Sequence, residues 1–361
     1  MNDLKKDIVI ATGGTGGHIF PAVGLVDYLN KNGFNTIITT DKRGLKFIDG
    51  KYVKNTILIN SSSLNKKNIL ISLCKIIIAV FKSLFFLSKK KPKFIFGMGG
   101  YGSFPICLAG AILRIPFVIY ENNLLIGKTN RYLIPFAKKI FVSYKEIQGI
   151  NIKYKSKVII VGNILRENIL NYSKINKDEI LSKLNILVLG GSQAAKVFAE
   201  KLPDVFIKCK KNNINLKIYQ QCLSEQEIDL KKKYSNNNIS YELFNFTFDI
   251  IKYYNLANLV ITRAGSSALA ELLNCKIPII SIPLASSSEN HQFINAQYFK
   301  EKGFGVMLEE KDINNGLFNL LQSIHSDKSM IKSIESNQKK YSDKNVFAII
   351  RKEMTKLFYE N

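Results

Sequence analysis

The sequence predicts an α/β protein made of two Rossmann-like halves, each with a parallel sheet. An apolar strand runs into a glycine-rich loop at residues 7–17, and a second runs into a small-residue loop at 185–195. Strands that alternate with helices favour parallel sheets with right-handed crossovers. The chain has 361 residues, more than one core usually supports, so two domains are expected.

The first half begins with the strand DIVIA at 7–11, which ends at the glycine loop. Apolar residues then follow helical spacing over 22–29, and Gly33 ends this helix. NTIIT at 35–39 is the next predicted strand. KFIF at 93–96 predicts another, and it leads into a second glycine-rich turn, FGMGGYGSFP.

Residues 69–87 are almost long enough to cross a membrane. Lys75 and Lys82 stand in the middle, and each costs about 2.5–3.5 kcal/mol at a bilayer centre. They share a helical face with Ser72 and Ala79, while the rest of the circumference is apolar and KKKPK follows. This pattern fits a helix that lies on a membrane surface better than one that crosses it. The alternative is a core helix that covers a sheet.

The linker between the halves is expected at 161–180, where the chain becomes polar and loses strand character. Further on, ITRAGSSALAELL at 261–273 predicts a strand, a tight turn at Gly265 and then a helix. Ser266 and Ser267 would cap that helix, and its free N–H groups would hold a diphosphate.

Composition limits the partners and the compartment. The formal net charge of +24 favours an anionic partner, although a generally basic surface is the alternative for most of the lysines. Basic patches interleaved with aromatic residues, zinc knuckles and basic helices are not evident, so no nucleic-acid partner is expected. The five cysteines lie far apart without a CxxC, which suggests neither a disulfide framework nor a zinc site. No signal peptide is expected before the first strand, and a reducing cytosol is the natural compartment.

The loop ATGGTGGHIFP at 11–21 can bring backbone N–H groups close to an anionic ligand, at the positive end of a helix. It is neither a Walker A motif nor a clean G-x-G-x-x-G, because Ile19 takes the third glycine position. Asp41 could still serve as a ribose-binding acid, so a dinucleotide dehydrogenase stays open as an alternative. A neutral His18 at the helix N-terminus could take a proton from a hydroxyl nucleophile, the alternative being a structural histidine.

Polar residues of the second half complete the candidates. Glu271 lies about one turn into the helix after Gly265, where it could accept hydrogen bonds from ribose hydroxyls. His291, Gln292 and Asn295 follow a strand and a proline turn and suit the recognition of hydroxyl groups.

Seven motifs occur in a fixed order along nearly the whole chain: GGTGGHIFPA, GMGGYGSFP, ENNLLIGKTNRYL, VGNILR, LGGSQAA, RAGSSALAEL and NHQFINA. In this order they closely resemble the MurG family, bacterial glycosyltransferases that add N-acetylglucosamine (GlcNAc) to the lipid-linked muramyl-pentapeptide precursor of peptidoglycan. Seven motifs in the family's order are far more specific evidence than a match to one glycine loop.

The resemblance implies a GT-B fold, in which two Rossmann-like domains with parallel sheets face a central cleft. The first domain would comprise 1–163 and 341–361, including a C-terminal helix at 345–360, and would receive the lipid acceptor at the cytoplasmic face of the inner membrane. The second, 164–340, would bind UDP-GlcNAc. The chain has no Asp-x-Asp pair, so neither a metal nor a cofactor is required.

The resemblance also assigns roles to single residues, with His18 as the catalytic base. The remaining assignments are to UDP-GlcNAc: Thr15, Gly16 and Gly17 to sugar and diphosphate, Asn123 to the GlcNAc hydroxyls, Arg166 near the donor, Ser192 to diphosphate, Thr247 to uracil, Ser266, Ser267, Ala268, Leu269, Ala270 and Glu271 to diphosphate and ribose, and His291 and Gln292 to the sugar.

Some positions depart from the family pattern. Tyr120 and Asn122 stand where His and Gln are common, and Ala194 replaces a glycine, which would restrict the approach of backbone to phosphate. Phe104 occupies a position that is often small and would narrow the acceptor path. His291 stands where Gln is common, so its sugar contact is the least secure assignment.

The implied reaction is an inverting transfer. The 4-hydroxyl of the acceptor (lipid I) attacks the anomeric carbon of UDP-GlcNAc, loses its proton to His18 and expels UDP, giving lipid II. The expected partners are therefore UDP-GlcNAc, lipid I and the anionic inner-membrane surface. Three alternatives stay open: a related GT-B glycolipid glycosyltransferase, a UDP-sugar epimerase of the same architecture, and a membrane-binding module without activity.

Overall fold

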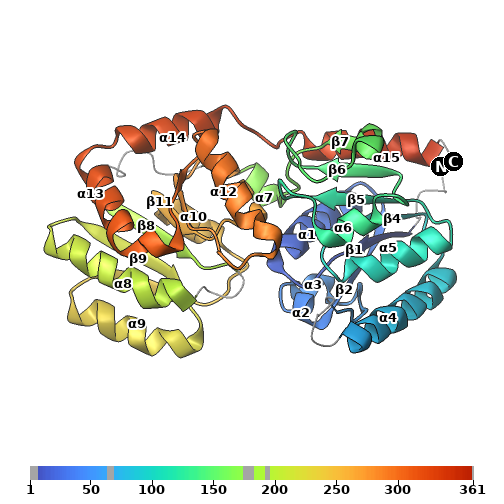
Figure 1. Cartoon of the computed structure of the whole chain (residues 1–361), viewed down its shortest axis with the longest axis horizontal. Coiled ribbons are helices and arrows are strands. Elements are labelled where there is room, and N and C mark those ends of the chain that lie inside the picture. Colours follow the sequence, from blue (N-terminus) through green and yellow to red (C-terminus); the bar gives the residue numbers. More distant parts are fainter. Residues whose placement is uncertain (1–6, 63–68, 174–182, 192–195, 360–361) are drawn as a thin grey trace. The chain divides into compact units, whose positions relative to one another are not determined.

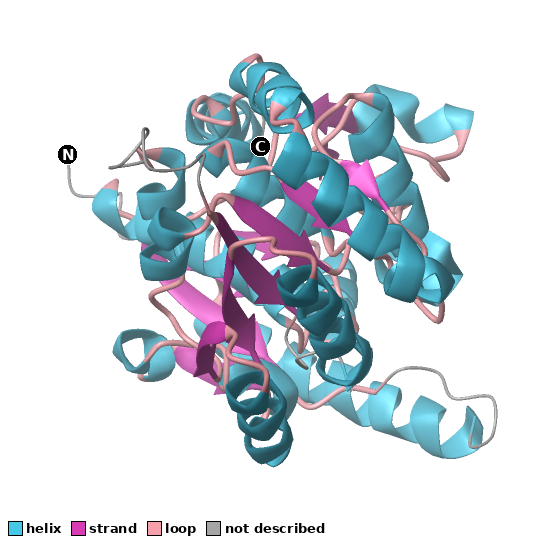
Figure 2. Ribbon diagram, turned by 90° about the vertical axis from the view of Figure 1, so that its left-hand side faces the viewer, coloured by secondary structure: helices cyan, strands magenta, loops and turns pink. Residues whose placement is uncertain are grey.

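The computed structural model describes residues 7–62, 69–173, 183–191 and 196–359, with side chains up to Leu357. The chain divides into two compact units, residues 1–167 with 343–361 and residues 168–342. Each unit is built on a parallel sheet with helices on both faces (Figures 1 and 2). The predicted α/β class with two Rossmann-like halves is confirmed.

The first unit has a seven-stranded sheet in the order β3-β2-β1-β4-β5-β6-β7, and all of its strand pairs are parallel. Its strands are β1 (Asp7–Ala11), β2 (Asn35–Thr40), β3 (Thr56–Leu58), β4 (Phe94–Gly97), β5 (Phe117–Glu121), β6 (Lys139–Val142) and β7 (Val158–Ile160). Its helices are α1 (Gly16–Lys31), α2 (Lys42–Leu45), α3 (Gly50–Val53), α4 (Ile69–Lys90), α5 (Ser103–Ile112), α6 (Lys128–Leu133) and α15 (Val346–Tyr359). A 3-10 helix at Ile152–Lys157 precedes β7, and the short α7 (Glu167–Leu170) crosses the boundary to the second unit.

The second unit has a six-stranded parallel sheet in the order β10-β9-β8-β11-β12-β13. Its strands are β8 (Leu184–Leu189), β9 (Leu216–Gln221), β10 (Ser240–Phe244), β11 (Leu259–Thr262), β12 (Ile279–Ser281) and β13 (Val306–Met307). Its helices are α8 (Lys196–Lys211), α9 (Ser224–Asn236), α10 (Ile251–Leu256), α11 (Ser266–Cys275), α12 (His291–Glu301), α13 (Phe318–Ser326) and α14 (Ser329–Lys339), with a π-helical turn at Ile313–Leu317 before α13.

The central strands are buried on both faces, and this explains their sequences. All residues of β4 and β5 are buried, as is all of β11. A strand covered by helices on both sides gains from apolar side chains at every position, so it reads as a continuous apolar run rather than an alternating one.

The order of strands determines where a ligand would bind in each unit. In both sheets the chain runs outward in one direction from the first strand and then returns to continue on its other side, so β1 lies beside β4 and β8 lies beside β11. Open α/β sheets bind ligands outside the carboxyl ends of the strands at such a switch point. The glycine-rich segments after β1, β4 and β8 and the turn at Gly265 after β11 all start at these strand ends.

The last helix belongs to the first unit although it ends the chain. Figure 1 shows α15, in red, among the elements of the first unit. Phe347 stacks on Tyr28 of α1, with ring centroids 4.5 Å apart. Just before the helix, the Asp343 carboxylate accepts hydrogen bonds from the backbone N–H of Asn163 at 2.8 Å and from its Nδ2 at 3.1 Å. These contacts tie the C-terminal segment to the first sheet.

Helix α4 packs against α5 through one narrow face, made of Ser72, Ala79, Ser83 and Leu87. The small residues predicted to share a face with two lysines therefore point into the unit. The core-helix alternative holds only for this face, because most of the apolar circumference is exposed. Its exposed residues are Ile69, Leu70, Ile71, Leu73, Ile77, Ile78, Phe81 and Phe85.

Candidate active site

The two glycine loops of the first unit interlock at the switch point. The N–H of Gly13 donates to the carbonyl of Gly99 at 2.9 Å, and the N–H of Met98 donates to that of Ala11 at 2.7 Å. A Cβ added at Gly13 would lie 2.6 Å from the Cα of Gly100, and one at Gly102 would lie 2.6 Å from the carbonyl oxygen of Thr12. These glycines are therefore needed for contact between two backbone segments, before any ligand is considered.

Gly17 differs from these packing glycines. An added Cβ there would meet only the Thr15 hydroxyl, at 3.9 Å. Thr15 is the N-cap of α1, and its carbonyl accepts hydrogen bonds from the N–H groups of His18 and Ile19. Gly17 in the first turn of α1 is thus the position where a ligand could approach the backbone, whereas an added Cβ at Gly16 would lie 3.1 Å from the Phe20 ring.

We expect alanine substitutions to separate the two kinds of glycine. Gly13→Ala should destabilise the protein by about 1–3 kcal/mol, because its Cβ overlaps the second loop. Gly17→Ala should leave the melting temperature unchanged or raise it, since alanine is the better helix former by about 1 kcal/mol. Thermal unfolding of both variants beside the wild type measures this. Equal losses of stability would contradict the assignment of Gly13 to loop packing.

His18 lies against the second glycine loop. Its Nδ1 is 3.0 Å from the carbonyl oxygen of Met98. A carbonyl only accepts hydrogen bonds, so Nδ1 carries the proton and Nε2 carries the lone pair of the neutral ring. A Cβ at Gly99 or at Gly100 would come within 3.0 Å of the imidazole. The bare backbone of this loop thus supports the ring, with Nε2 as its basic nitrogen.

The loop after β5 is organised around a buried carboxylate. Glu121, 2% exposed, accepts hydrogen bonds from the backbone N–H and Nδ2 of Asn123 at 3.1 and 2.8 Å, from the N–H of Gly127 at 2.9 Å and from Nδ2 of Asn130 at 3.0 Å. Asn123 is therefore held in one orientation. The sequence named Asn123 but not Glu121, whose role depends on contacts made by the residues after it.

The departures at two positions have structural explanations. Tyr120 is buried, and its hydroxyl lies 2.8 Å from the Ser143 hydroxyl and accepts a hydrogen bond from the N–H of Ile164 at 3.0 Å. Burial raises the pKa of this phenol, so it remains protonated and supports the chain at Ile164. Phe104 packs partly buried against the core of the first unit.

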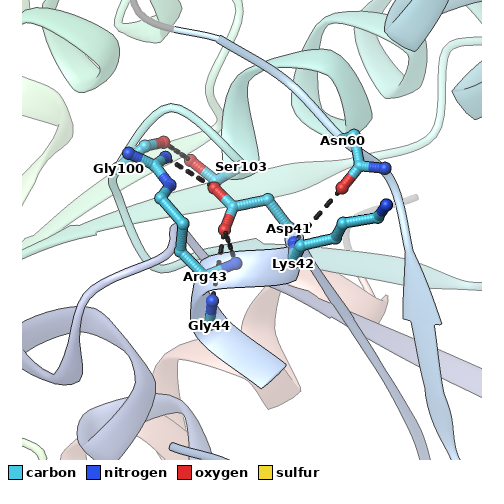
Figure 3. Close-up of polar contacts among 7 residues, drawn as sticks. All are labelled: Asp41, Lys42, Arg43, Gly44, Asn60, Gly100 and Ser103. Atoms are coloured by element: carbon cyan, nitrogen blue, oxygen red, sulfur yellow. Dashed lines mark hydrogen bonds and ion pairs between the residues drawn. The ribbon is translucent and has the colours of Figure 1, made fainter. Parts of the chain in front are cut away.

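Asp41 is already engaged as the N-cap of α2. Its carboxylate accepts hydrogen bonds from the N–H groups of Arg43 and Gly44 at 2.9 and 3.2 Å and pairs with the Arg43 guanidinium at 2.6 Å (Figure 3). The side chain is 4% exposed. The expectation that Asp41 could bind a ribose, as in a dehydrogenase, is therefore wrong, because its oxygens stabilise the helix start and the neighbouring cation.

In the second unit, Gly265 follows β11 and is the N-cap of α11, without a side-chain cap. The expectation that Ser266 or Ser267 caps this helix is wrong, since both lie within its first turn. Among the residues that the structure describes, an added Cβ at Gly265 or at Gly191 would meet none within 4 Å. The backbone at the start of α11 is thus accessible to an anion.

The side chains of α11 differ in burial and in their contacts. Leu269 and Ala270 are buried in the unit, at 0% and 1% exposure, so their side chains serve the core. Glu271 is 6% exposed and accepts a hydrogen bond from the Tyr254 hydroxyl at 3.0 Å. Ala268 is partly exposed.

The segment around α12 also borders the carboxyl end of β11. Nδ2 of Asn295 donates to the carbonyl of Ala264 at 3.2 Å. Oε1 of Gln292 accepts from the N–H of Leu284 at 3.0 Å, and Nδ1 of His291 lies 2.6 Å from the carbonyl oxygen of Ser288. These side chains fold the loop before α12 onto the helix.

Three further assignments complete the placement. Thr247 lies after β10 and accepts a hydrogen bond from the N–H of Asp249 at 3.1 Å. Arg166 belongs to the first unit, where its guanidinium lies over the Phe20 ring, 5.2 Å from the centroid. Ser192 and the departure at Ala194 lie outside the described residues. Within the described part of the chain, no group of three or more His, Cys, Asp or Glu side chains could hold a metal.

Comparisons with known proteins cover both units. Residues 8–142 match the glycosyltransferase family 28 N-terminal domain, and residues 185–351 match the glycosyltransferase family 28 C-terminal domain. A transferase of Pelagibacter ubique, named UDP-N-acetylglucosamine--N-acetylmuramyl-(pentapeptide) pyrophosphoryl-undecaprenol N-acetylglucosamine transferase, is 36% identical over 99% of this chain and 100% of its own. A Rickettsia canadensis protein of the same name is 37% identical over 86% of this chain and 88% of its own.

Solved structures agree in fold. MurG of Acinetobacter baumannii superposes with a TM-score of 0.74 at 22% identity, covering 97% of this chain and 99% of that one. A UDP-N-acetylglucosamine 2-epimerase superposes with a TM-score of 0.67 at 12% identity, covering 99% and 98%. Because both identities are low, these likenesses show the fold and not the reaction.

Proposed function

The chain belongs to the MurG family of glycosyltransferase family 28, and we propose how its own residues carry out the sugar transfer. It transfers GlcNAc from UDP-GlcNAc to the lipid-linked muramyl-pentapeptide (lipid I) and so forms lipid II for peptidoglycan. The observation that carries this conclusion is the 36% identity that spans the chain and its relative from end to end. The expected GT-B fold is confirmed by the two parallel sheets and the structural neighbours.

His18 is the base in this proposal. Its Nδ1–H is directed at the Met98 carbonyl, which leaves Nε2 to take the proton from the acceptor's 4-hydroxyl. The hydroxyl oxygen bonds to the anomeric carbon, the bond from that carbon to the UDP oxygen breaks, and the configuration inverts. Asn123, fixed by Glu121, would bind hydroxyls of the transferred sugar.

The start of α11 is proposed to receive the negative charge of the leaving UDP. An added Cβ at its N-cap, Gly265, would meet no atom of the described segments within 4 Å. Backbone N–H groups at a helix N-terminus favour an anion without rearrangement. Glu271, which accepts from Tyr254, has an acceptor-only carboxylate suited to ribose hydroxyls. Ser266 and Ser267 lie in the same first turn.

We expect Gly265→Ala to weaken UDP binding without weakening the fold. The added methyl group meets no atom within 4 Å in the described part of the chain, and φ is −69°, which alanine adopts readily. If the diphosphate contacts the backbone here, the methyl group occupies its place, and the Kd for UDP should rise by roughly tenfold or more, equal to about 1.4 kcal/mol. Calorimetric titration with UDP measures the loss. An unchanged Kd would move the diphosphate away from this turn.

The exposed face of α4 is proposed to lie on the cytoplasmic surface of the inner membrane. By length and composition alone this helix could cross a membrane. However, its buried residues run from Ser72 to Leu87 against the unit, so only its outer side is available to lipid. Lys75 and Lys82 are exposed beside that side, and lysines follow at its end, as suits an anionic surface.

The reaction is tested with purified protein, labelled UDP-GlcNAc and lipid-linked muramyl-pentapeptide. We expect labelled lipid II and one UDP for each sugar transferred. Release of UDP without transfer would instead favour an epimerase, and transfer to another glycolipid in preference to lipid I would favour the related glycosyltransferase.

A further inference from the structure

The helix that carries His18 contains a proline in its second turn. Pro21 lies inside α1. In an α-helix the N–H of each residue donates to the carbonyl four positions earlier, and proline has no N–H to donate. Its ring also crowds that carbonyl. Pro21 therefore cannot supply the helical hydrogen bond to the carbonyl of Gly17, the residue before His18.

A side chain from a distant segment donates to that carbonyl. Nδ2 of Asn122, which follows β5, lies 2.9 Å from the carbonyl oxygen of Gly17. Asn122 is 5% exposed, so this hydrogen bond is shielded from solvent. Losing a hydrogen-bond partner costs most at such a buried position. The bond joins the loop after β5 to the first turn of α1, across 105 positions of sequence.

The other end of the same amide faces Asn123. Oδ1 of Asn122 accepts from Nδ2 of Asn123 at 3.1 Å, and Nδ2 of Asn123 also donates to Glu121 at 2.8 Å. A side-chain amide carries a donor and an acceptor on one rigid group, so it can make both bonds at once. Asn122 thus lies between Asn123 and the peptide group of Gly17 and His18.

We propose that Asn122 is a positioning residue that couples the sugar-contacting loop to the base. The carbonyl of Gly17 and the nitrogen of His18 share one rigid peptide plane, so a bond to this carbonyl orients the backbone from which the imidazole extends. Met98 fixes the ring at Nδ1, and Asn122 fixes the backbone behind it. The inference rests on the proposed role of His18 as base.

Asn122→Asp tests the coupling with the smallest change of shape. A carboxylate can still accept from Asn123 but cannot donate to Gly17. We expect kcat for GlcNAc transfer to fall about 10–100-fold, because misplacement by about 1 Å can cost that much, while KM for UDP-GlcNAc stays within about threefold. Asn122→Gln keeps a donor and an acceptor and should retain more activity than the aspartate variant.

Asn32→Asp is the matched control. Nδ2 of Asn32 donates to the carbonyl of Tyr28 at 2.8 Å, which is the same kind of bond at the opposite end of the same helix. This variant should keep the wild-type kcat. A loss as large as that of Asn122→Asp would show a general effect on α1 and would overturn the proposal.

A second pair of variants guards against misfolding and tests the part played by Pro21. Asn122→Ser is uncharged and too short to reach Gly17, and it should also lower kcat. In a Pro21→Ala background, residue 21 can donate to the Gly17 carbonyl itself. The factor by which Asn122→Ser lowers kcat should therefore be smaller in this background than in the wild type. An equal loss in both backgrounds, or wild-type kcat in a folded Asn122→Asp, overturns the inference. A wild-type protein that transfers no sugar would instead refute the proposed function.

Discussion

Replacing His18 by alanine is expected to lower kcat for GlcNAc transfer by about 10²–10⁴-fold, the usual contribution of a general base. The loss should fall on kcat because Nε2 interacts with the acceptor proton in the transition state. The affinity for UDP should change little, since the start of α11 lies in the other unit. Initial rates with lipid I, beside calorimetric titration with UDP, measure the two effects separately.

The chain provides a matched control in His325 of α13, a partly exposed histidine of the second unit. His325→Ala should keep the wild-type kcat. Retained transfer in His18→Ala would remove His18 as the base but would leave the family membership intact. A fall in UDP affinity equal to the fall in kcat would show that His18 serves donor binding instead.

Removing large apolar side chains from the outer face of α4 is expected to release the protein from anionic membranes. Ile78, Phe81 and Phe85 are 54%, 67% and 64% exposed. Burying one such side chain is worth about 1.5–3 kcal/mol, so replacing all three with serine should weaken partitioning by roughly 10³-fold or more. Sedimentation with phosphatidylglycerol vesicles measures the bound fraction.

The same variant should keep its melting temperature, because these side chains are more than half exposed. Its rate with a water-soluble acceptor should also stay at the wild-type value. Ile228→Ser is the matched control, since Ile228 of α9 is 78% exposed but lies on the second unit. Vesicle binding that survives the triple substitution would contradict the membrane face. Added salt should weaken the lysine contribution in the wild type.

Several features were readable from the sequence because they depend on local patterns. The strand runs ending at glycine loops predicted both parallel sheets, and the turn at Gly265 was placed correctly before α11. The capping serines were misplaced by one position, because the residue preceding them, Gly265, already takes the extended conformation of an N-cap. Asp41 was mistaken for a ribose ligand because its use by Arg43 and Gly44 depends on a short helix that the pattern did not reveal.

The glycines illustrate the same limit at the site. The sequence predicted that the first glycine loop as a whole brings backbone N–H groups close to a ligand, and it did not separate Gly13 from Gly17. In the structure Gly13 and Gly102 serve contact between two loops, while Gly17 and Gly265 have room beside them. Nothing local distinguishes these groups, because the neighbour that a Cβ would strike comes from a segment far away in the chain.

The sequence by itself determined the fold class, the family and the residue types placed at each strand end, since periodicity, glycine spacing and motif order are properties of neighbouring residues. Only the tertiary structure decided which nitrogen of His18 is basic, which carboxylate holds Asn123, and which side chain donates to the Gly17 carbonyl. Those contacts join residues that are distant in the chain. Their hydrogen bonds can form only after the sheet has brought the loops that follow β1, β4 and β5 together.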